Sequence, residues 1–177
     1  MKVFFSCSSK VNIDRKYIEA ASDIAAEVSE DNDLIIGCAM EEGMAGAIIK
    51  QFKNNNREIN VKTLKLYNEN PDSFPYTTFS FYEDTFDRTK NIYKDSDILL
   101  ILPGGTGTLS ELLAFIEDHR TLDNDKDIII FNQDGYYDDF LNIVERNVND
   151  KFNSESTLQE FIVFTKIEEI TNYFRNN

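Results

Sequence analysis

Residues 99–113 read Leu-Leu-Ile-Leu-Pro-Gly-Gly-Thr-Gly-Thr-Leu-Ser-Glu-Leu-Leu, an apolar run followed by a glycine-rich turn and a segment with helical spacing. The apolar run predicts a buried strand. The glycines at 104, 105 and 107 leave the turn (residues 103–108, here called the glycine turn) without the Cβ atoms that would keep a ligand from the backbone. Because the amino end of a helix attracts anions, we expect a strand, an anion-binding turn and a helix.

Thr108 and Glu111 also have an explanation that needs no ligand. Their spacing is that of a capping box, in which Thr108 caps the helix and Glu111 reaches back to the amide of the capping residue. Glycine is also common in strand-to-helix turns for geometry alone. The segment is not a Walker P-loop, because no Lys-Ser/Thr pair follows at the required spacing, and the Gly-x-Gly-x-x-Gly pattern is missing. On these residues alone, the ligand-binding and the structural interpretations both stand.

The rest of the chain alternates short apolar runs with segments whose apolar residues recur every three or four positions. Strands are expected at residues 3–7, 34–38, 61–67, 77–82, 97–102, 126–131 and 161–164. Helices are expected at residues 13–28, 43–52, 84–94, 109–117, 136–148 and 167–174. Such alternation is typical of a parallel sheet with helices on both faces. We therefore predict an α/β fold with a Rossmann-like, doubly wound parallel sheet.

Length and composition narrow the function classes. A chain of 177 residues with 41% hydrophobic content and no Pro/Ser/Gly-rich linker suits a single α/β domain over residues 1–177. The net charge of −14 would repel a polyphosphate backbone, which argues against a nucleic-acid partner. No apolar run approaches the roughly 18 residues of a membrane span, and the chain begins without a leader-like segment. We therefore expect no membrane partner and a cytoplasmic location.

The two cysteines, Cys7 and Cys38, each end an apolar run. A small buried thiol is the commoner role at such positions, and a disulfide between the two is the alternative. With His119 as the single histidine, they do not make a metal-binding constellation, so no metal site is expected.

The motif Pro-Gly-Gly-x-Gly-Thr-x-x-Glu at 103–111 resembles the signature of the LOG ("lonely guy") family, nucleoside 5′-monophosphate phosphoribohydrolases long described as possible lysine decarboxylases. Three further segments resemble family motifs in the same order. Residues 5–9, Phe-Ser-Cys-Ser-Ser, are similar to its first-strand Phe-Cys-Gly-Ser-Ser. Asp87-Arg88 resembles the Glu-Arg of its Met-His-Glu-Arg-Lys segment, and residues 132–137 resemble its Asn-x-x-Gly-Tyr-Tyr.

The resemblance implies a Rossmann-like fold and hydrolysis of the N-glycosidic bond of a nucleoside 5′-monophosphate, of the AMP or cytokinin-nucleotide type, to a free base and ribose 5-phosphate. It also implies a small-molecule nucleotide as ligand, no cofactor, and a homodimer. Cleavage gives the ribosyl centre oxocarbenium character, which a nearby carboxylate stabilises. We expect Glu111 to be that carboxylate. We expect Arg88 to be catalytic as well, either by clamping the ribose phosphate or by supporting the departing base.

The expected substrate-binding residues belong to three segments. Glycine-turn amides and hydroxyls would hold the 5′-phosphate, and serines after the first strand would line the pocket. In the loop at 37–46, Gly43 and Gly46 match the family pattern, and Gly43 is expected to bind substrate. These residues are Gly104, Gly105, Thr106, Gly107, Thr108, Ser8, Ser9 and Gly43. For the two serines, a plain turn role is the alternative.

The chain also departs from the family pattern. Glu41 and Glu42 place carboxylates in the 37–46 loop, where glycines would let the backbone approach a ligand. Phe86 stands where the family has histidine, and Thr89 where it has lysine. The acidic loop is either an ordinary helix start, where the helix dipole favours acidic residues, or a reshaped pocket, and it leaves the identity of the base open. Phe86 and Thr89 support a second hypothesis, in which the protein is a nucleotide-binding sensor or carrier that does not hydrolyse its ligand.

Overall fold

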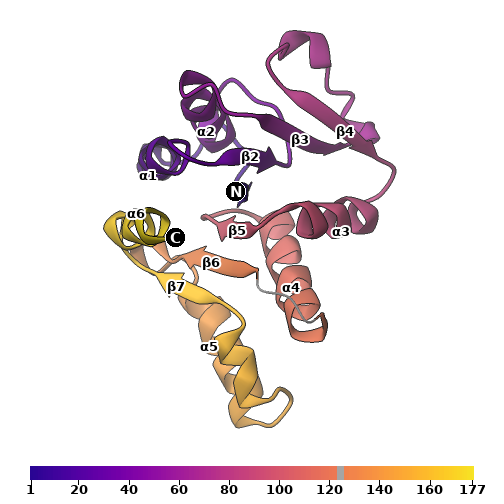
Figure 1. Ribbon diagram of the computed structural model, residues 1–177. Helices are drawn as coiled ribbons and strands as arrows, with labels where there is room; N and C mark the ends of the chain where they lie inside the picture. Colours follow the sequence, from indigo (N-terminus) through magenta and orange to yellow (C-terminus); the bar gives the residue numbers. More distant parts are fainter. Residues whose placement is uncertain (123–125) are drawn as a thin grey trace.

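The computed structural model describes residues 1–122 and 126–177, which contain a seven-stranded sheet with every neighbouring pair of strands parallel (Figure 1). The strands are β1 (Lys2–Ser6), β2 (Asp33–Ile36), β3 (Ile59–Leu64), β4 (Thr78–Tyr82), β5 (Ile98–Ile101), β6 (Asp127–Phe131) and β7 (Ile162–Phe164). Their order across the sheet is β4-β3-β2-β1-β5-β6-β7. The predicted α/β fold with a parallel sheet is confirmed.

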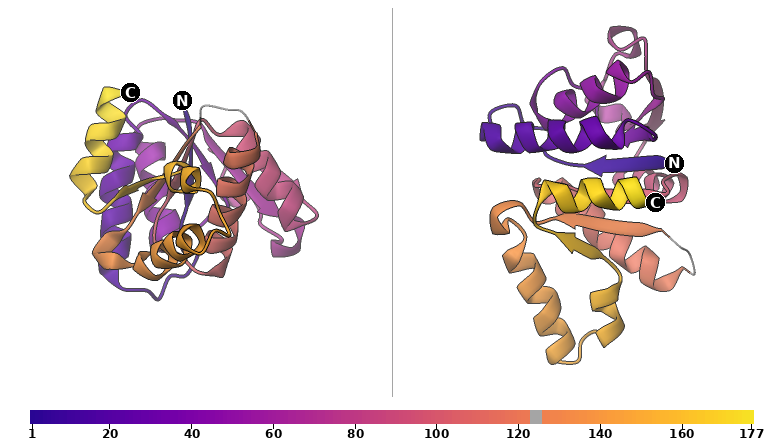
Figure 2. Two further views of the ribbon diagram at one scale, coloured as in Figure 1. Left: turned by 90° about the horizontal axis from the view of Figure 1, so that it is seen from below. Right: turned by 60° about the vertical axis from the view of Figure 1, so that its left-hand side comes forward.

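Helices cover both faces of the sheet. They are α1 (Arg15–Val28), α2 (Gly43–Asn54), α3 (Thr85–Asp95), α4 (Thr106–Thr121), α5 (Asp138–Asn149) and α6 (Ile167–Asn176). One face carries α1, α2 and α6, and the other carries α3, α4 and α5 (Figure 1). Figure 2 shows α6, at the carboxyl end of the chain, beside α1 on the first of these faces. Within the described ranges, no helix has both the length and the apolar character that a bilayer crossing requires.

Two separate cores explain why the central strands read as uninterrupted apolar runs. Successive residues of a strand point to opposite faces. Val3 and Phe5 of β1 therefore pack with α1, α2 and α6, whereas Phe4 packs with α3, α4 and α5. All four residues of β5 are buried. A parallel strand with helices on both sides has no solvent face, so no polar residue alternates with the apolar ones.

The start of α4 differs from the sequence-based expectation. The helix begins at Thr106, and Gly105 occupies the capping position without a side-chain hydrogen bond. The Thr108 hydroxyl instead donates to the Cys7 carbonyl oxygen at 3.3 Å, which ties the helix to the segment after β1. The capping-box interpretation of Thr108 and Glu111 is therefore wrong, and the glycine turn runs directly into the helix.

The segment after β3 also differs from expectation. The strand ends at Leu64 rather than Tyr67, and residues Lys65–Tyr67 form a short 3₁₀ turn, η1. Asn68 follows in the left-handed region with φ of 49°. The apolar and β-favouring residues of this stretch suggested a longer strand, but the chain leaves the sheet and turns toward its carboxyl-end edge.

The direction of winding changes between β1 and β5. From β1 the chain builds outward through β2, β3 and β4, then returns to place β5 on the other side of β1. In open α/β sheets, ligands bind where the strand order reverses, at the carboxyl ends of the strands. Ser6 of β1 lies opposite Ile101 of β5 in the sheet register, so the segments that follow both strands emerge side by side.

Candidate functional site

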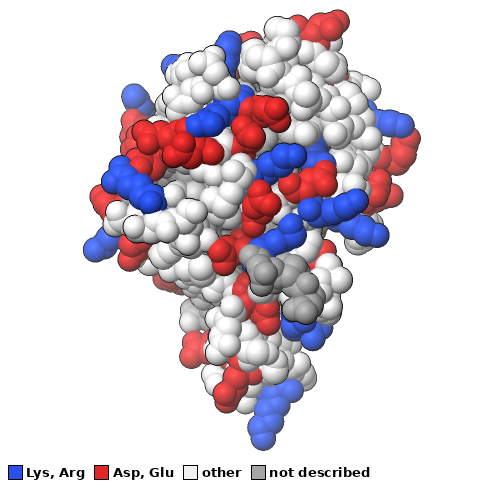
Figure 3. All heavy atoms as spheres, viewed as in Figure 1, with Lys and Arg blue, Asp and Glu red and all other residues white. Residues whose placement is uncertain are grey.

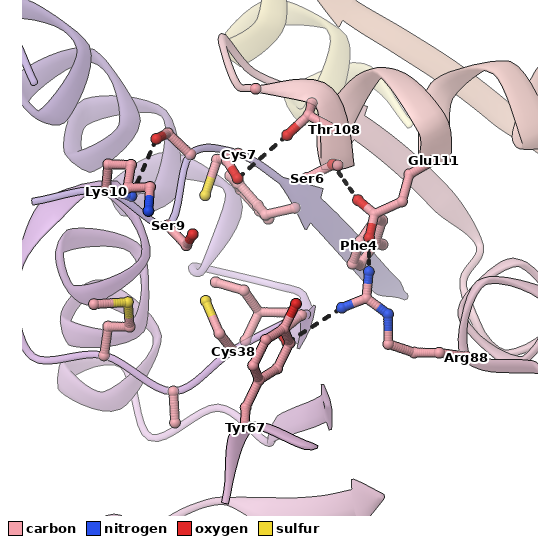
Figure 4. Close-up of a pocket in the computed structure, with 18 of the residues that line it drawn as sticks. Phe4, Ser6, Cys7, Ser9, Lys10, Cys38, Tyr67, Arg88, Thr108 and Glu111 are labelled. Atoms are coloured by element: carbon pink, nitrogen blue, oxygen red, sulfur yellow. Dashed lines mark hydrogen bonds and ion pairs between the residues drawn. The ribbon is translucent and has the colours of Figure 1, made fainter. Parts of the chain in front are cut away.

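A pocket of about 630 Å³ opens at the carboxyl ends of β1 and β5 (Figure 4). Its walls come from the segments after β1, β2 and β3, from α3, and from the first turns of α4. Most of the residues predicted to bind or act on a substrate line it, namely Ser8, Ser9, Arg88, Gly105, Thr106, Gly107, Thr108 and Glu111. The structure therefore brings together segments that lie far apart in the sequence.

Gly43 and Gly104 do not line this pocket, and each position requires glycine for a different structural reason. A Cβ atom on Gly104 would lie 2.1 Å from Thr108 Oγ1, so only glycine lets the turn pack against the first turn of α4. Gly43 begins α2 with φ of +69°, and a Cβ atom there would lie 3.0 Å from the Lys10 carbonyl oxygen. Both positions shape the backbone behind the pocket.

Gly105 and Gly107 behave differently, because a Cβ atom on either would meet no other atom within 4 Å. Packing therefore does not demand glycine at these two positions. Both line the pocket, at the amino end of α4 where free backbone N–H groups and the helix dipole favour an anion. The arrangement leaves room for a phosphate-sized group to approach the backbone closely.

A buried cluster of three side chains lies beside this anion position. Ser6 Oγ, at the end of β1, donates a 2.5 Å hydrogen bond to Glu111 Oε2 on α4. Arg88 Nη2, from α3, forms an ion pair with Glu111 Oε1. In Figure 4 the Glu111 carboxylate lies between Ser6 and the Arg88 guanidinium. One strand and two helices thus fix the carboxylate by its side-chain partners rather than by main-chain amides.

The electrostatics of Glu111 follow from its burial. The side chain is nearly enclosed, and burial raises the pKa of its carboxyl, while the Arg88 charge and the hydrogen bond from Ser6 oppose that rise. Gly37 helps to admit the guanidinium, since a Cβ atom there would lie 3.2 Å from Arg88 Nη1. Nη1 itself approaches the Gly37 carbonyl oxygen at 3.5 Å. The result is a fixed carboxylate and a fixed cation in a largely water-excluded wall.

Sequence reasoning assigned no role to several other residues of the pocket. Ser6 belongs to the segment 5–9 that resembles a family motif, but as the polar residue that ends an apolar strand it has no predicted role of its own. Tyr67 and Glu69 line the pocket from a segment that was expected to be strand and loop, so no pattern indicated them. Cys7 and Cys38 also line the pocket and are both free. Burial raises the pKa of the Cys38 thiol to about 12 and that of Cys7 well above its usual value, so both are protonated thiols at neutral pH.

The segment 132–137 supports the glycine turn from behind. The Tyr136 hydroxyl donates to the Gly104 carbonyl oxygen at 2.7 Å, and the Tyr137 hydroxyl donates to the Leu102 carbonyl oxygen at 2.7 Å. The Tyr137 amide in turn donates to Asn132 Oδ1 at 2.7 Å. The two tyrosines therefore hold the backbone on either side of Pro103, and neither lines the pocket.

Comparison with known proteins places this site in a family context. A family model described as possible lysine decarboxylase matches residues 38–174. A rice protein (Oryza sativa subsp. japonica) named probable cytokinin riboside 5′-monophosphate phosphoribohydrolase is 29% identical over 152 residues, which cover 85% of this chain and 60% of that protein. A cytokinin riboside 5′-monophosphate phosphoribohydrolase of Arabidopsis thaliana is 30% identical over 159 residues, covering 89% of this chain and 73% of that protein.

Solved structures share the fold at much lower sequence identity. The molybdenum cofactor carrier protein of Chlamydomonas reinhardtii superposes with a TM-score of 0.70 at 10% identity, over 99% of this chain and 96% of that one. The molybdenum cofactor binding protein of the phototrophic bacterium Rippkaea orientalis gives a TM-score of 0.66 at 15% identity, over 99% and 94%. These likenesses extend to the fold alone.

Proposed function

Because the chain belongs to the LOG family of possible lysine decarboxylases, we propose that it hydrolyses the N-glycosidic bond of a nucleoside 5′-monophosphate, of the AMP or cytokinin-nucleotide type. The products are a free base and ribose 5-phosphate. The observation that carries the proposal is the buried Ser6–Glu111–Arg88 cluster, which faces a pocket next to the amino end of α4. Family members with related sequences are named for this reaction.

The glycine turn is the proposed phosphate site. Backbone N–H groups of Gly105, Thr106 and Gly107 and the Thr106 hydroxyl lie at the amino end of α4, where a dianionic phosphate is favoured, whereas the Thr108 hydroxyl is already donated to the Cys7 carbonyl oxygen. Ser8 and Ser9 would add hydroxyl donors from the segment after β1, where the Ser8 amide donates to the Pro103 carbonyl oxygen at 3.3 Å. Holding the phosphate in this way fixes the ribose relative to Glu111, so that much of the entropy cost of reaching the transition state is met on binding.

Glu111 is the proposed catalytic carboxylate. As the bond between C1′ and the base nitrogen breaks, its electron pair leaves with the base and positive charge develops on the sugar. An ionised Glu111 stabilises that charge and accepts one proton of the attacking water, whose oxygen becomes the new C1′ hydroxyl. Solvent protonates the departing base nitrogen, and Glu111 returns its proton to solvent. Arg88 holds the carboxylate in place through one terminal nitrogen. Its other terminal nitrogen is only weakly engaged with Gly37 and has capacity for a sugar or base oxygen.

The direct test is incubation of the purified full chain with AMP, other nucleoside monophosphates and a cytokinin nucleotide, with release of base followed by chromatography and ribose 5-phosphate measured in parallel. We expect release of both products in equal amounts. Glu111→Gln keeps the size of the side chain and should reduce kcat by at least about a hundredfold. Nucleotide binding without any release, under conditions in which a known family member is active, would reject the hydrolase.

A second candidate function is nucleotide binding without hydrolysis, as in a sensor or carrier. It is favoured by Phe86 and Thr89, which replace the histidine and lysine of the family pattern. Two structural neighbours are themselves named a carrier and a binding protein. Calorimetry separates the candidates, because a carrier retains intact nucleotide at equilibrium whereas a hydrolase gives a heat signal that continues with turnover.

We further propose that the protein acts as a homodimer in the cytoplasm and has neither nucleic acid nor membrane as partner. The free thiols of Cys7 and Cys38 are what a reducing compartment maintains. Over the face drawn in Figure 3, basic side chains are interspersed with acidic ones rather than collected into one surface, and the net charge is −14. A nucleic-acid partner would need a continuous basic surface.

A further inference from the structure

The rim of the pocket carries an aromatic ring, that of Tyr67, which has no role in the proposed hydrolysis. Tyr67 lines the pocket but is 58% exposed, and in Figure 4 its ring projects toward the centre of the hollow. Among the described residues it takes part in no hydrogen bond and no ring contact. An exposed and unpacked ring at the rim of a pocket keeps both of its faces available to a ligand.

The backbone beneath this ring is fixed. Residues 65–69, here called the strap, turn back over the pocket after β3, with Asn68 in the left-handed conformation. Glu69 ties the strap down on two sides: its Oε2 accepts from the Ala39 amide at 3.1 Å, and its Oε1 accepts from the Thr63 hydroxyl at 3.0 Å. The strap is therefore anchored both to the segment after β2 and to β3, while the Tyr67 ring stays free to meet a ligand.

The two sides of the pocket differ in character. In Figure 4, Ser6 and Thr108 lie on one side, near the anion position, whereas Cys38 and Tyr67 lie across the hollow. Ala39 and Met40, which continue the wall from Cys38, are also apolar, and the Glu69 carboxylate on this side accepts hydrogen bonds from Ala39 and Thr63. A nucleotide has the same asymmetry, because its phosphate is charged and its base is a flat, weakly polar ring.

We propose that Tyr67 is the stacking platform for the base of the nucleotide and that the strap, held by Glu69, positions it. This inference rests on the proposed function and assigns the base end of the same pocket. A base that stacks on an aromatic side chain gains affinity largely through the face of its ring, which every base offers. The area of the ring therefore matters more than the hydrogen-bonding groups on its edge. The pocket should therefore prefer purine over pyrimidine monophosphates and tolerate substituents on the purine edge.

The test compares AMP with ribose 5-phosphate, which carries the same sugar phosphate but no base. Dissociation constants are measured by calorimetry on the full chain, using Glu111→Gln as the background so that AMP is not consumed. Tyr67→Ala should weaken AMP binding by about tenfold or more, the range found when a stacking aromatic is removed. It should leave the affinity for ribose 5-phosphate unchanged. Tyr67→Phe keeps the ring and should bind AMP like the parent protein.

Leu66→Ala is the matched control, because Leu66 is 72% exposed on the same strap and does not line the pocket. It should change neither affinity. Glu69→Ala should weaken AMP binding through the loosened strap. Glu69→Gln should restore it, since the amide still accepts from Ala39 and donates to the Thr63 hydroxyl. Thermal melting verifies that each variant is folded.

The chain contains no tryptophan, so Tyr67→Trp provides a single fluorescent reporter at the proposed platform. AMP should quench or shift its emission, whereas ribose 5-phosphate should not. Equal losses of AMP and ribose 5-phosphate binding in Tyr67→Ala, or an unchanged AMP affinity, would overturn the stacking role while leaving the proposed hydrolysis intact. If the parent protein binds neither compound, the proposed function and this inference fall together.

Discussion

At the scale of single residues, Glu111 is subject to opposing influences that set when it is charged. Burial raises the pKa of its carboxyl, and the Arg88 charge and the Ser6 hydroxyl each lower it, with burial the largest of the three. The net shift is upward. If the ionised form is the active one, kcat/KM falls as the pH drops through this raised pKa, so the acid limb should lie above the range of an ordinary glutamate.

Removing the Ser6 hydroxyl should move this limb further. In Ser6→Ala the carboxylate loses a donor that stabilises only its charged form, so the pKa of Glu111 rises and the acid limb of kcat/KM shifts to higher pH by about one unit. Activity well above the limb should change less. The measurement is a pH profile of kcat/KM from pH 4 to 9 for the parent protein and the variant, with about 1 unit as the expected separation.

Ser96→Ala is the matched control for this experiment. Ser96 is equally buried and also donates its hydroxyl, but to the Ile92 carbonyl oxygen at the end of α3, away from the pocket. Its profile should coincide with that of the parent protein. A limb that stays in place in Ser6→Ala would show that Glu111 is not the group whose ionisation controls the rate.

The difference between Ser6 and Glu111 shows how far single residues can be predicted from sequence. Glu111 and Arg88 were indicated by family motifs, and the structure places them in contact. Ser6 lies in the segment 5–9 that resembles a family motif, but that motif has cysteine at this position, so no role was indicated for the serine. Its role depends on α4 crossing the end of β1, and that arrangement exists only in the tertiary structure.

At the scale of an element, the glycine turn contains glycines that serve two different purposes. Gly107→Ala adds a Cβ atom in open space within the pocket and replaces glycine in a helix, so the free energy of unfolding should stay the same or rise by up to about 1 kcal/mol. The added Cβ atom also stands beside the backbone amides of the proposed phosphate site, which Gly107 lines. Binding of ribose 5-phosphate should therefore weaken by about tenfold or more, as measured by calorimetry.

Gly104→Ala is the counterpart, and the opposite result is expected. Its Cβ atom would overlap Thr108, at 2.1 Å from Oγ1 and 2.7 Å from Cβ, so the turn or the helix has to shift. Chemical denaturation should show a loss of about 2 kcal/mol. The distinction between the two kinds of glycine would be wrong if Gly107→Ala unfolded the protein and Gly104→Ala left its stability unchanged.

The glycine turn is also supported by the segment 132–137, and removal of the Tyr137 hydroxyl measures how much this support contributes to stability. Tyr137 is 1% exposed, and its hydroxyl is buried against the Leu102 carbonyl oxygen. Tyr137→Phe leaves that oxygen without this donor and should lower the free energy of unfolding by about 1 kcal/mol, or the melting temperature by about 2–4 °C. Tyr17→Phe, which removes a hydroxyl that makes no hydrogen bond among the described residues, should melt like the parent protein. Equal melting temperatures of the two variants would contradict the role of Tyr137 in supporting the glycine turn.

At the scale of the whole molecule, the alternation of apolar runs and helical periodicity was sufficient to predict the sheet, because buried parallel strands and amphipathic helices each have a strong local signal. The location of the pocket could also be predicted, since ligands of such sheets bind at the carboxyl ends of the strands where the strand order reverses. The path of the strap, by contrast, could not be predicted from the sequence. Residues 65–67 continue the expected strand in the sequence, whereas in the structure they form a 3₁₀ turn that is followed by Asn68 in the left-handed region, and Glu69 holds the segment to Ala39 and Thr63.

The exposed surface of α3 and α4 leads to a prediction about assembly. Phe86 on α3 is 86% exposed and Leu113 on α4 is 55% exposed, and these neighbouring helices also carry Arg88 and Glu111. Large apolar side chains left in water favour association, and a homodimer that covers them would also hold the two catalytic helices against each other. Light scattering should give twice the 20.5 kDa mass of the chain.

Phe86→Glu should return the protein to a monomer without unfolding it, because the side chain is almost fully in solvent in a single copy, and kcat should fall as α3 loses its support. Phe152→Glu is the matched control, since Phe152 is 80% exposed beyond the end of α5, far from Arg88 in the sequence and outside the two catalytic helices. It should remain dimeric and active. A parent protein that is monomeric at micromolar concentration, or a dimer that survives Phe86→Glu but not Phe152→Glu, would place the subunit contact elsewhere and separate assembly from the chemistry of the pocket.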